Sequence, residues 1–329
     1  MAAPMVKRSS LIINNIFSNY IRKNISKCKR SISFSRVNGG DNTSQTHFGY
    51  ENIPEDEKEE RVYKVFENVA TKYDLMNDAM SAGIHRLWKD YFISKMAPTP
   101  GTQLVDVAGG TGDIAFRFLN YVRNEDSESY NNQDRQFDVE TPPELRSISE
   151  LDEISESGES KTEKAKSFVT ICDINQAMLD VGKSKAENLG FSSETCFIQG
   201  NAENLPLESN KYDVYTIAYG IRNCTHIDKV LQEAYRVLKP GGRFMCLEFS
   251  HVTYPLIQQL YDSYSFQVIP VMGQVLAQDW KSYQYLVESI RQFPKQEEFV
   301  EMIRNAGFKM AKYENITFGV TAIHSGFKI

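Results

Sequence analysis

A glycine-rich turn between a buried strand and a helix constrains the fold more than any other feature of this sequence. Residues 103–108 (QLVDVA) predict a short buried strand, Gly109, Gly110 and Gly112 follow it, and 113–122 predict an apolar-rich helix. Glycine lets the backbone approach a ligand closely, because a Cβ atom would collide with it. In an open α/β sheet, ligands bind outside the carboxyl ends of the strands. The turn therefore predicts a ligand site, although a tight structural turn or a dinucleotide site would give the same local pattern.

Strand and helix segments alternate along most of the remaining chain. The expected strands are 168–173, 195–200, 212–219, 243–249, 309–315 and 320–327, and the expected helices are 175–189, 228–238 and 296–306. This alternation predicts an α/β fold with a doubly wound, mostly parallel sheet and helices on both of its faces.

An acidic stretch interrupts the alternation. Residues 124–160 contain twelve acidic residues, two bases and many serines, so they carry too little apolar surface to offset the entropy of ordering. We expect a disordered surface insertion there, which is either tolerated loop growth or a docking segment for a partner. Without it, Asp106 and Asp173 have the spacing of about 20 residues that is normal for a βαβ unit.

The N-terminal region differs in charge from the rest of the chain. The first 37 residues contain eight Lys and Arg residues and no acid, which predicts a mitochondrial transit peptide over 1–37. A disordered basic tail that binds nucleic acid or acidic membranes is the alternative. Removing the eight charges would change the formal net charge from −6 to −14, and so acidic a protein is a poor candidate for binding nucleic acid. We expect a polar linker over 38–56 and one domain over 57–329, which begins with a helix at 57–80.

Composition limits two further classes of site. No apolar stretch reaches the roughly 18 residues needed to span a bilayer, so we expect any membrane contact to be peripheral. The five cysteines are widely spaced, and no His/Cys cluster has the spacing of metal ligands. We therefore expect reduced cysteines and no metal.

Charged and polar residues at the strand ends favour S-adenosylmethionine as the ligand. Asp173 closes the second strand, where a carboxylate can accept both hydroxyls of a ribose. Asp106 would face the cationic amino-acid end of S-adenosylmethionine, whereas it would repel the pyrophosphate of a dinucleotide. A nicotinamide-dependent oxidoreductase would also predict a GxGxxG turn, which this sequence lacks at this position.

The turn resembles the first motif of the class I methyltransferases, which runs acid-x-Gly-x-Gly-x-Gly. Asp106, Gly110 and Gly112 match the motif, and Ala108 stands in place of its first glycine. The resemblance implies a Rossmann-like, seven-stranded sheet with an N-terminal helical extension. It also implies which residues bind the cofactor: Asp106, Gly110, Thr111 and Gly112 at the methionine part, Asp173 at the ribose, and Asn201 and Ala202 beside the adenine.

Two longer segments resemble the paired signatures of the ubiquinone/menaquinone C-methyltransferase family. They are 73–88 (YDLMNDAMSAGIHRLW), which is highly specific, and 236–250 (RVLKPGGRFMCLEFS), whose helix stop is shared by many methyltransferases. The resemblance implies methyl transfer from S-adenosylmethionine to a ring carbon of a methoxylated polyprenyl-1,4-benzoquinol during ubiquinone synthesis. It further implies partners, which are other enzymes of a multi-subunit ubiquinone-biosynthesis complex, and peripheral association with the matrix face of the mitochondrial inner membrane.

Three residues are the first candidates for catalysis. Arg222 and Asn223 follow the fourth strand, and Tyr73 lies in the N-terminal extension, where it would cover the pocket and orient the ring. Arginine stays protonated, so Arg222 would lower the pKa of the phenol or position a basic water rather than act as a base. The alternatives are that Arg222 only pairs with an acid, and that Tyr73 and Trp88 only pack.

The remaining candidates rank lower. His85, His226 and His251 are conventional bases, but a lone histidine is more often structural. The apolar segment 254–286 predicts a helical cap over a long substrate tail, with Leu260 and Phe266 in contact with that tail; ordinary packing or a homodimer interface is the alternative. The rival function is a scaffold for a biosynthetic complex, against which the intact turn and Asp173 argue.

Overall fold

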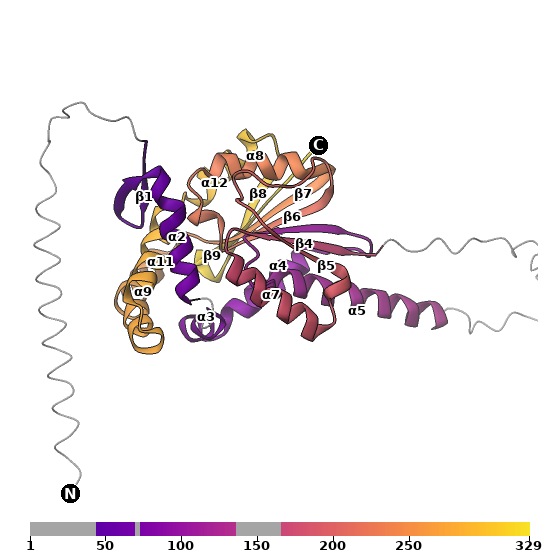
Figure 1. The fold of residues 1–329 in the computed structure, drawn as a ribbon, viewed down its shortest axis with the longest axis horizontal. Helices are drawn as coiled ribbons and strands as arrows, with labels where there is room; N and C mark the ends of the chain where they lie inside the picture. The colour runs from indigo at the N-terminus through magenta and orange to yellow at the C-terminus, as the bar shows by residue number, and fades with distance from the viewer. Residues whose placement is uncertain (1–43, 70–72, 136–165) are drawn as a thin grey trace, which may run out of the picture. The chain divides into compact units, whose positions relative to one another are not determined.

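The computed structural model describes residues 44–69, 73–135 and 166–329 (Figure 1), and the statements below concern these residues. The expected transit peptide, 1–37, and the central part of the acidic insertion lie outside them.

The expected seven-stranded, mostly parallel sheet is confirmed. Its strands are β3 (Gln103–Val107), β4 (Phe168–Asp173), β5 (Thr195–Gln199), β6 (Tyr212–Ala218), β7 (Leu238–Phe249), β8 (Lys309–Ile316) and β9 (Thr321–Phe327). They lie in the order β5-β4-β3-β6-β7-β9-β8, and only the pairings of β9 with β7 and β8 are antiparallel. Because the first five strands run parallel, their carboxyl ends meet at one edge, where α/β proteins bind ligands.

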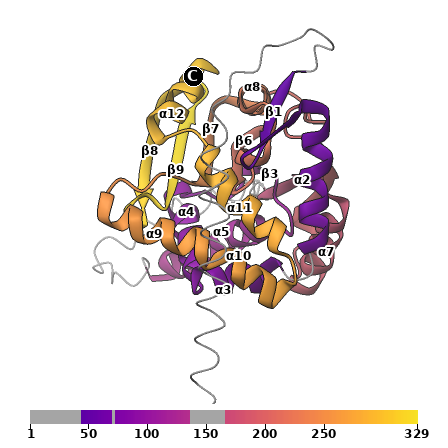
Figure 2. The same cartoon turned by 90° about the vertical axis from the view of Figure 1, so that its left-hand side faces the viewer.

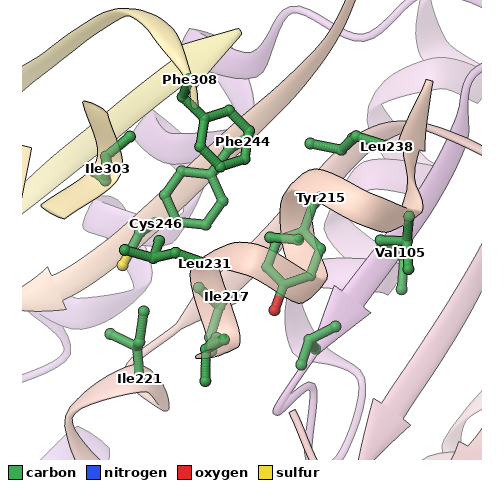
Figure 3. Packing of buried hydrophobic residues seen from close by; sticks show 14 of the residues in the cluster. Val105, Tyr215, Ile217, Ile221, Leu231, Leu238, Phe244, Cys246, Ile303 and Phe308 are labelled. Carbon is green, nitrogen blue, oxygen red and sulfur yellow. The ribbon is translucent and has the colours of Figure 1, made fainter. Parts of the chain in front are cut away.

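Helices cover both faces of the sheet, as expected. Figure 1 shows α8 (Ile227–Val237) and α12 (Gln296–Asn305) on one side, and α4 (Ile84–Met96), α5 (Asp113–Arg135) and α7 (Gln176–Leu189) on the other. Neighbouring residues of each strand point to opposite faces. Tyr215, Phe244 and Cys246 thus pack with Leu231 and Ile303 of the first pair (Figure 3), whereas Leu104, Ile171 and Met245 pack with Phe92, Phe118 and Leu179 of the second group.

The N-terminal extension differs from the expected linker and single helix. Residues 45–54 form a hairpin of β1 (Gln45–Phe48) and β2 (Glu51–Pro54), and α2 (Glu55–Val69) and α3 (Tyr73–Ser81) are separate helices. The linker assignment over 38–56 is therefore wrong for the hairpin. The hairpin is held by contacts distant in sequence, because Phe48 stacks on Tyr285 with ring centroids 4.1 Å apart and Ile53 is buried. A local polarity pattern contains no sign of such contacts.

The acidic insertion begins later than expected. Helix α5 continues past 122 to Arg135, so residues 124–135 are helical rather than disordered. Its first turns are anchored by the buried Phe116, Phe118 and Leu119, and a helix whose start is fixed by packing extends at little cost, since each added residue gains a hydrogen bond.

The expected helical cap after β7 is present. It consists of α9 (Pro255–Gln267), α10 (Ile269–Met272), the π-helical turn η5 (Gly273–Ala277) and α11 (Trp280–Gln292), which lie beside α2 and α3 in both views (Figure 2). Among the described residues, no helix is both long enough and apolar enough to cross a bilayer.

Candidate functional site

The first pocket lies at the carboxyl edge of the parallel strands and, counted with the open space at its mouth, has a volume of about 1190 Å³. Loops that follow β3, β4, β5 and β6 form its floor, and α2 lies across it with Glu59, Val62, Tyr63 and Phe66. Of the expected cofactor residues, six line this pocket: Asp106, Gly110, Thr111, Asp173, Asn201 and Ala202. Gly112 does not, and its left-handed φ of 83° shapes the turn, where a Cβ would lie 2.8 Å from the ring of Phe116.

The turn after β3 is built from left-handed residues. Gly110 has φ 53°, and Ala108, which replaces the motif's first glycine, has φ 51°. A left-handed alanine is strained by roughly 1–2 kcal/mol, so surrounding contacts must hold it in place. Gly220 packs against it so closely that a Cβ there would lie 2.4 Å from the Cβ of Ala108. Two adjacent loops are thus locked together beside the pocket.

Asp173 organises the rim through its two carboxylate oxygens. Oδ2 accepts the backbone N–H of Gly110 at 2.9 Å, and Oδ1 accepts that of Asn175 at 2.8 Å. Burial raises the pKa of Asp173, while these hydrogen bonds oppose the shift because they stabilise the charged form. A carboxylate has about four acceptor sites, so Asp173 retains capacity for a further donor such as a ribose hydroxyl.

Asp106 is buried, and only one of its two carboxylate oxygens accepts a hydrogen bond from the described residues. Thr216 Oγ1 donates to Oδ1 at 2.8 Å, whereas Oδ2 has no hydrogen-bond partner among the described residues. Burial, together with the nearby Asp113 and Asp173, raises the pKa of Asp106 to about 7. A buried acceptor without a partner fits a cationic ligand group such as the ammonium of S-adenosylmethionine, so these residues fit the expected cofactor.

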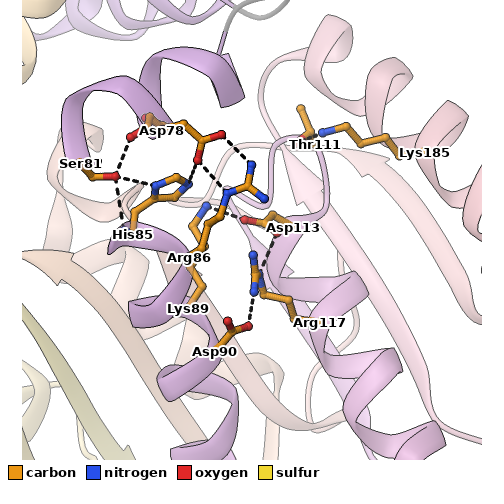
Figure 4. Close-up of polar contacts among 11 residues, drawn as sticks. Asp78, Ser81, His85, Arg86, Lys89, Asp90, Thr111, Asp113, Arg117 and Lys185 are labelled. Carbon is orange, nitrogen blue, oxygen red and sulfur yellow. Dashed lines mark hydrogen bonds and ion pairs between the residues drawn. The ribbon is translucent and has the colours of Figure 1, made fainter. Parts of the chain in front are cut away.

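Lys89, a residue that sequence reasoning missed, crosses the inner end of this pocket from α4. Its Nζ lies 2.6 Å from Oδ2 of Asp113, which Arg117 also contacts (Figure 4). Lys185 donates to Thr111 at 3.1 Å. The only sequence signal for Lys89 was its place directly after the specific 73–88 segment.

Polar contacts tie α2 to the loops beneath it. Asn201 donates to Glu59 at 2.9 Å and accepts the N–H of Glu203 at 2.8 Å. The buried Lys58 donates to the carbonyl of Cys224 at 3.0 Å. Asn201 therefore lies at the pocket as expected, but its amide nitrogen contacts the covering helix.

The second pocket is formed mainly by helices and, counted with the open space at its mouth, has a volume of about 1060 Å³. Its walls are mainly apolar and aromatic, and come from α2, α3, α4 and the cap: they include Val65, Met76, Met80, Trp88, Phe249, Tyr261, Tyr264, Ile269, Tyr283, Tyr285, Leu286 and Ile290. Phe66, Lys89 and Tyr219 line both pockets, so the two cavities adjoin at these residues. A polar ligand and an apolar one could thus meet at this boundary.

Comparison with known proteins identifies the family. Residues 55–328 match the ubiE/COQ5 methyltransferase family. The chain belongs to the ubiE/COQ5 methyltransferase family. Proteins named "2-methoxy-6-polyprenyl-1,4-benzoquinol methylase, mitochondrial" are 59% identical in Bos taurus, 58% in Xenopus laevis and 58% in Homo sapiens; each alignment covers 87% of this chain, and 84%, 90% and 85% of the respective relative.

Family membership confirms the expectation of a methyltransferase with the class I fold and S-adenosylmethionine as methyl donor. The expected mitochondrial location is confirmed in its coarse form, since each of these relatives is named as mitochondrial. Within 44–69, 73–135 and 166–329, no group of three or more His, Cys, Asp or Glu side chains is arranged to hold a metal ion.

In this methyltransferase, the neighbours Arg222 and Asn223 line different pockets. Arg222 lines the second pocket, and its Nη1 donates to Glu248 at 2.8 Å and to the carbonyl of Tyr219 at 2.5 Å. Asn223 lines the first pocket and accepts the hydroxyl of Tyr285 at 3.0 Å. Arg222 therefore does pair with an acid, the alternative considered above, and it does so at the wall of a pocket.

The other expected residues of the methyltransferase are placed as follows. Tyr73 begins α3, but its side chain lies outside what the structure describes. Trp88 packs at the second pocket and donates to Thr317 at 2.8 Å. His226 contacts Glu203 and Glu55, and His251 contacts the carbonyl of Phe293, so both have structural partners.

The two cap residues expected to contact the tail lie on the exposed side of the cap. Leu260 is 67% exposed and Phe266 37% exposed, and neither lines the second pocket. Tyr261, Tyr264 and Ile269 of the same segment line it instead. Apolar content located the cap, but it could not tell which side of α9 faces inward.

Proposed function

We propose that this chain transfers the methyl group of S-adenosylmethionine to a ring carbon of 2-methoxy-6-polyprenyl-1,4-benzoquinol, in ubiquinone biosynthesis. One observation carries the proposal: a pocket at the strand ends that contains the acids Asp106 and Asp173 adjoins a more apolar, aromatic pocket, and Phe66, Lys89 and Tyr219 line both. Two substrates of opposite polarity need such a boundary, where the methyl group and the ring carbon can be aligned. The names of the relatives supply the specific quinol.

In the first pocket, the chain binds and orients the methyl donor. When bound, S-adenosylmethionine supplies a methyl group already activated on a sulfonium. The carboxylate of Asp173 would accept hydrogen bonds from the ribose hydroxyls, and the unpartnered Oδ2 of Asp106 would accept one from the ammonium. The backbone of Gly110 and Thr111 lies along the methionine part, and Asn201 and Ala202 border the adenine.

In the second pocket, Arg222 prepares the ring for attack. A quinol carbon becomes a stronger nucleophile when an adjacent hydroxyl loses its proton. The guanidinium of Arg222 lowers the pKa of that hydroxyl, because a fixed positive charge in an apolar cavity stabilises the phenolate. Glu248 orients the guanidinium, and Asn223 braces the adjacent loop through Tyr285. Tyr73 is proposed to cover the ring from α3.

The polyprenyl tail leaves the ring along the cap, beside Tyr261, Tyr264 and Ile269. The outer side of this cap exposes apolar side chains, including Leu256 at 72%, Leu260 at 67% and Val275 at 71%. These exposed residues support peripheral binding to the matrix face of the inner membrane, where such a substrate dissolves. They are equally suited to contact other enzymes of a ubiquinone-synthesis complex or a second copy of the chain. Co-sedimentation with cardiolipin-containing vesicles tests the first of these surfaces, and loss of sedimentation in Leu256→Ser with Leu260→Ser is expected.

Label transfer from methyl-labelled S-adenosylmethionine to a short-tailed 2-methoxy-6-prenyl-1,4-benzoquinol tests the function. We expect label on the ring carbon with the wild type and with Arg304→Ala, a surface control whose exposed guanidinium contacts Glu301. Asp173→Ala is expected to lose cofactor binding, and Arg222→Ala to bind the cofactor but lose label transfer. Cofactor binding without label transfer in the wild type would instead favour the scaffold function.

A further inference from the structure

One histidine of the second pocket has chemistry that the reaction above leaves unassigned. The described residues lining this pocket include tyrosines and serines, which keep their protons at neutral pH, one lysine and one arginine. His85 is the one lining side chain among them that exchanges a proton easily near neutral pH. No described carboxylate lines this pocket.

Hydrogen bonds around Ser81 determine which nitrogen of His85 carries the proton. The hydroxyl of Ser81 donates to the carbonyl of Asn77 at 2.7 Å, and its oxygen lies 2.7 Å from Nδ1 of His85 (Figure 4). A hydroxyl has one proton to donate, so the hydrogen bond from Ser81 to Asn77 assigns the role of donor to Nδ1 in its contact with Ser81. The backbone N–H of His85 occupies the second lone pair of Ser81 at 3.4 Å. With the proton on Nδ1, the Nε2 atom carries an available lone pair.

The surroundings of Nε2 keep that lone pair accessible. Nε2 lies 3.8 Å from Oδ1 of Asp78, beyond hydrogen-bond distance, and Arg86 contacts both oxygens of Asp78 at 2.7 and 2.6 Å. The imidazole is thus near a carboxylate that would favour its protonated form without blocking Nε2.

Four charged groups act on this imidazole. Burial lowers the pKa of His85. The positive charges of Lys89 and Arg86 lower it further, and the carboxylates of Asp78 and Asp113 partly oppose the shift. The ring is therefore neutral at physiological pH, the state in which it can accept a proton. His85 also lies one turn from Lys89 on α4, and Lys89 lines both pockets.

We infer that His85 is the proton acceptor for the quinol ring, with Ser81 as the positioning residue that holds Nε2 unprotonated. The ring hydroxyl gives its proton to Nε2, and the resulting negative charge is stabilised by Arg222. The ring carbon then forms a bond to the methyl group as the bond between that methyl and sulfur breaks, with its electron pair left on sulfur. The hydrogen on the methylated carbon leaves as a proton, the ring regains its aromaticity, and the oxygen is reprotonated, so one proton is released per turnover.

His85→Asn is the main test, because its amide can still donate to Ser81 but offers no base at the Nε2 position. We expect the rate of label transfer at saturating cofactor to fall about 10²–10⁴-fold, with S-adenosylhomocysteine affinity and thermal unfolding unchanged. His251→Asn, which alters a histidine outside both pockets, is the matched control and should retain its rate. For Ser81→Ala we expect a smaller loss and an altered acid limb of the pH profile.

Two further measurements separate a proton acceptor from a structural residue. The wild-type rate should fall in acid with an apparent pKa below the usual 6.5 of histidine, and His85→Asn should lack this limb. A quinol with electron-withdrawing ring fluorine, whose hydroxyl is more acidic and therefore needs less help from a base, should recover part of the rate in His85→Asn but not in Arg222→Ala. Imidazole should partly restore His85→Ala.

The inference rests on the proposed function, but the two fail differently. A wild type that methylates no quinol overturns both. Suppose that the wild type methylates the quinol. If the rate of His85→Asn is then within about tenfold of the wild-type rate and its pH profile has the same acid limb, only the assignment of His85 is overturned. A large loss that neither the fluorinated quinol nor imidazole relieves also overturns it.

Discussion

The two pockets of this methyltransferase are formed by different kinds of structural elements. The first is formed by loops at strand ends, and its contacts are backbone amides and the acids Asp106 and Asp173. The second is formed mainly by side chains of helices, and Arg222 at its wall forms a buried ion pair with Glu248, which lies outside the lining. A substitution in the first pocket should therefore alter cofactor affinity, whereas one in the second should alter stability and ring chemistry.

The buried acids of the two regions show the same contrast. Glu248 is fully buried and neutralised by Arg222, and it also accepts the backbone N–H of Phe249 at 2.9 Å. Asp106 is equally buried but leaves Oδ2 without a partner among the described residues. Glu248 thus finds its charge partner within the chain, whereas Asp106 has an acceptor atom left for a ligand.

The largest effect on the free energy of unfolding is expected from breaking the ion pair between Arg222 and Glu248. Glu248→Ala removes the carboxylate that neutralises Arg222 in the protein interior, and loss of one partner of a buried pair costs about 3–5 kcal/mol. Urea unfolding measures this change, and Glu248→Gln, which keeps a hydrogen-bond acceptor, is expected to lose less. A loss below about 1 kcal/mol for Glu248→Ala would mean that water compensates the charge of Arg222.

A smaller effect is expected from Asp173→Ala. The substitution removes two backbone hydrogen bonds and the acceptor for ribose, and hydrogen bonds to charged groups contribute about 1.5–3 kcal/mol. We expect S-adenosylhomocysteine affinity to fall by roughly 10–100-fold by isothermal titration calorimetry, with quinol affinity unchanged. An equal loss of quinol affinity would show that the two pockets are not separable.

This difference also explains what the sequence could predict. The first pocket follows strands whose apolar runs are local, and Gly110, Asp173 and Asn201 each lie directly after one of them. The second pocket brings together residues as distant as Trp88, Arg222 and Tyr285, and no local pattern encodes their meeting. Apolar content located the cap but did not distinguish Leu260 from Tyr261, because α9 carries apolar or aromatic residues on its exposed side as well as on the side that lines the second pocket. The hairpin of β1 and β2 was missed because contacts distant in sequence hold it, such as the stacking of Phe48 on Tyr285.

A pH-dependent effect of intermediate size should distinguish Asp106 from the paired acid. Its pKa of about 7 in the folded state exceeds the usual 3.8, so the folded state binds a proton that the unfolded state has lost. This carboxyl therefore favours folding at low pH, and its contribution falls by roughly 1.4 kcal/mol per pH unit as the pH rises from about 4 to about 7.

Unfolding of the ligand-free protein by urea at pH 5 and pH 7 measures that slope. Asp106→Asn cannot ionise and should be less sensitive to pH than the wild type over this range. Because a bound ammonium would lower the pKa of Asp106, cofactor binding near pH 6.5 should also release protons, which calorimetry in buffers of different ionisation enthalpy detects. Identical slopes for the variant and the wild type would mean that Asp106 is already ionised in the ligand-free protein.

The smallest effect is expected at Ala108, where the turn of the first pocket is strained. Ala108→Gly relieves a left-handed alanine, worth roughly 1–2 kcal/mol, but frees the unfolded chain at a cost of about 0.4–1 kcal/mol. We expect a net stabilisation between zero and about 1.6 kcal/mol, measured by urea unfolding, whereas Ala234→Gly inside α8 should destabilise by about 1 kcal/mol or more. The Cβ of Ala108 also packs against Gly220, so its removal loosens the link between the two loops. If Ala108→Gly gains stability and weakens cofactor binding, the alanine serves to hold the loops in register for the ligand; if it gains stability with unchanged binding, the rest of the turn holds that register alone.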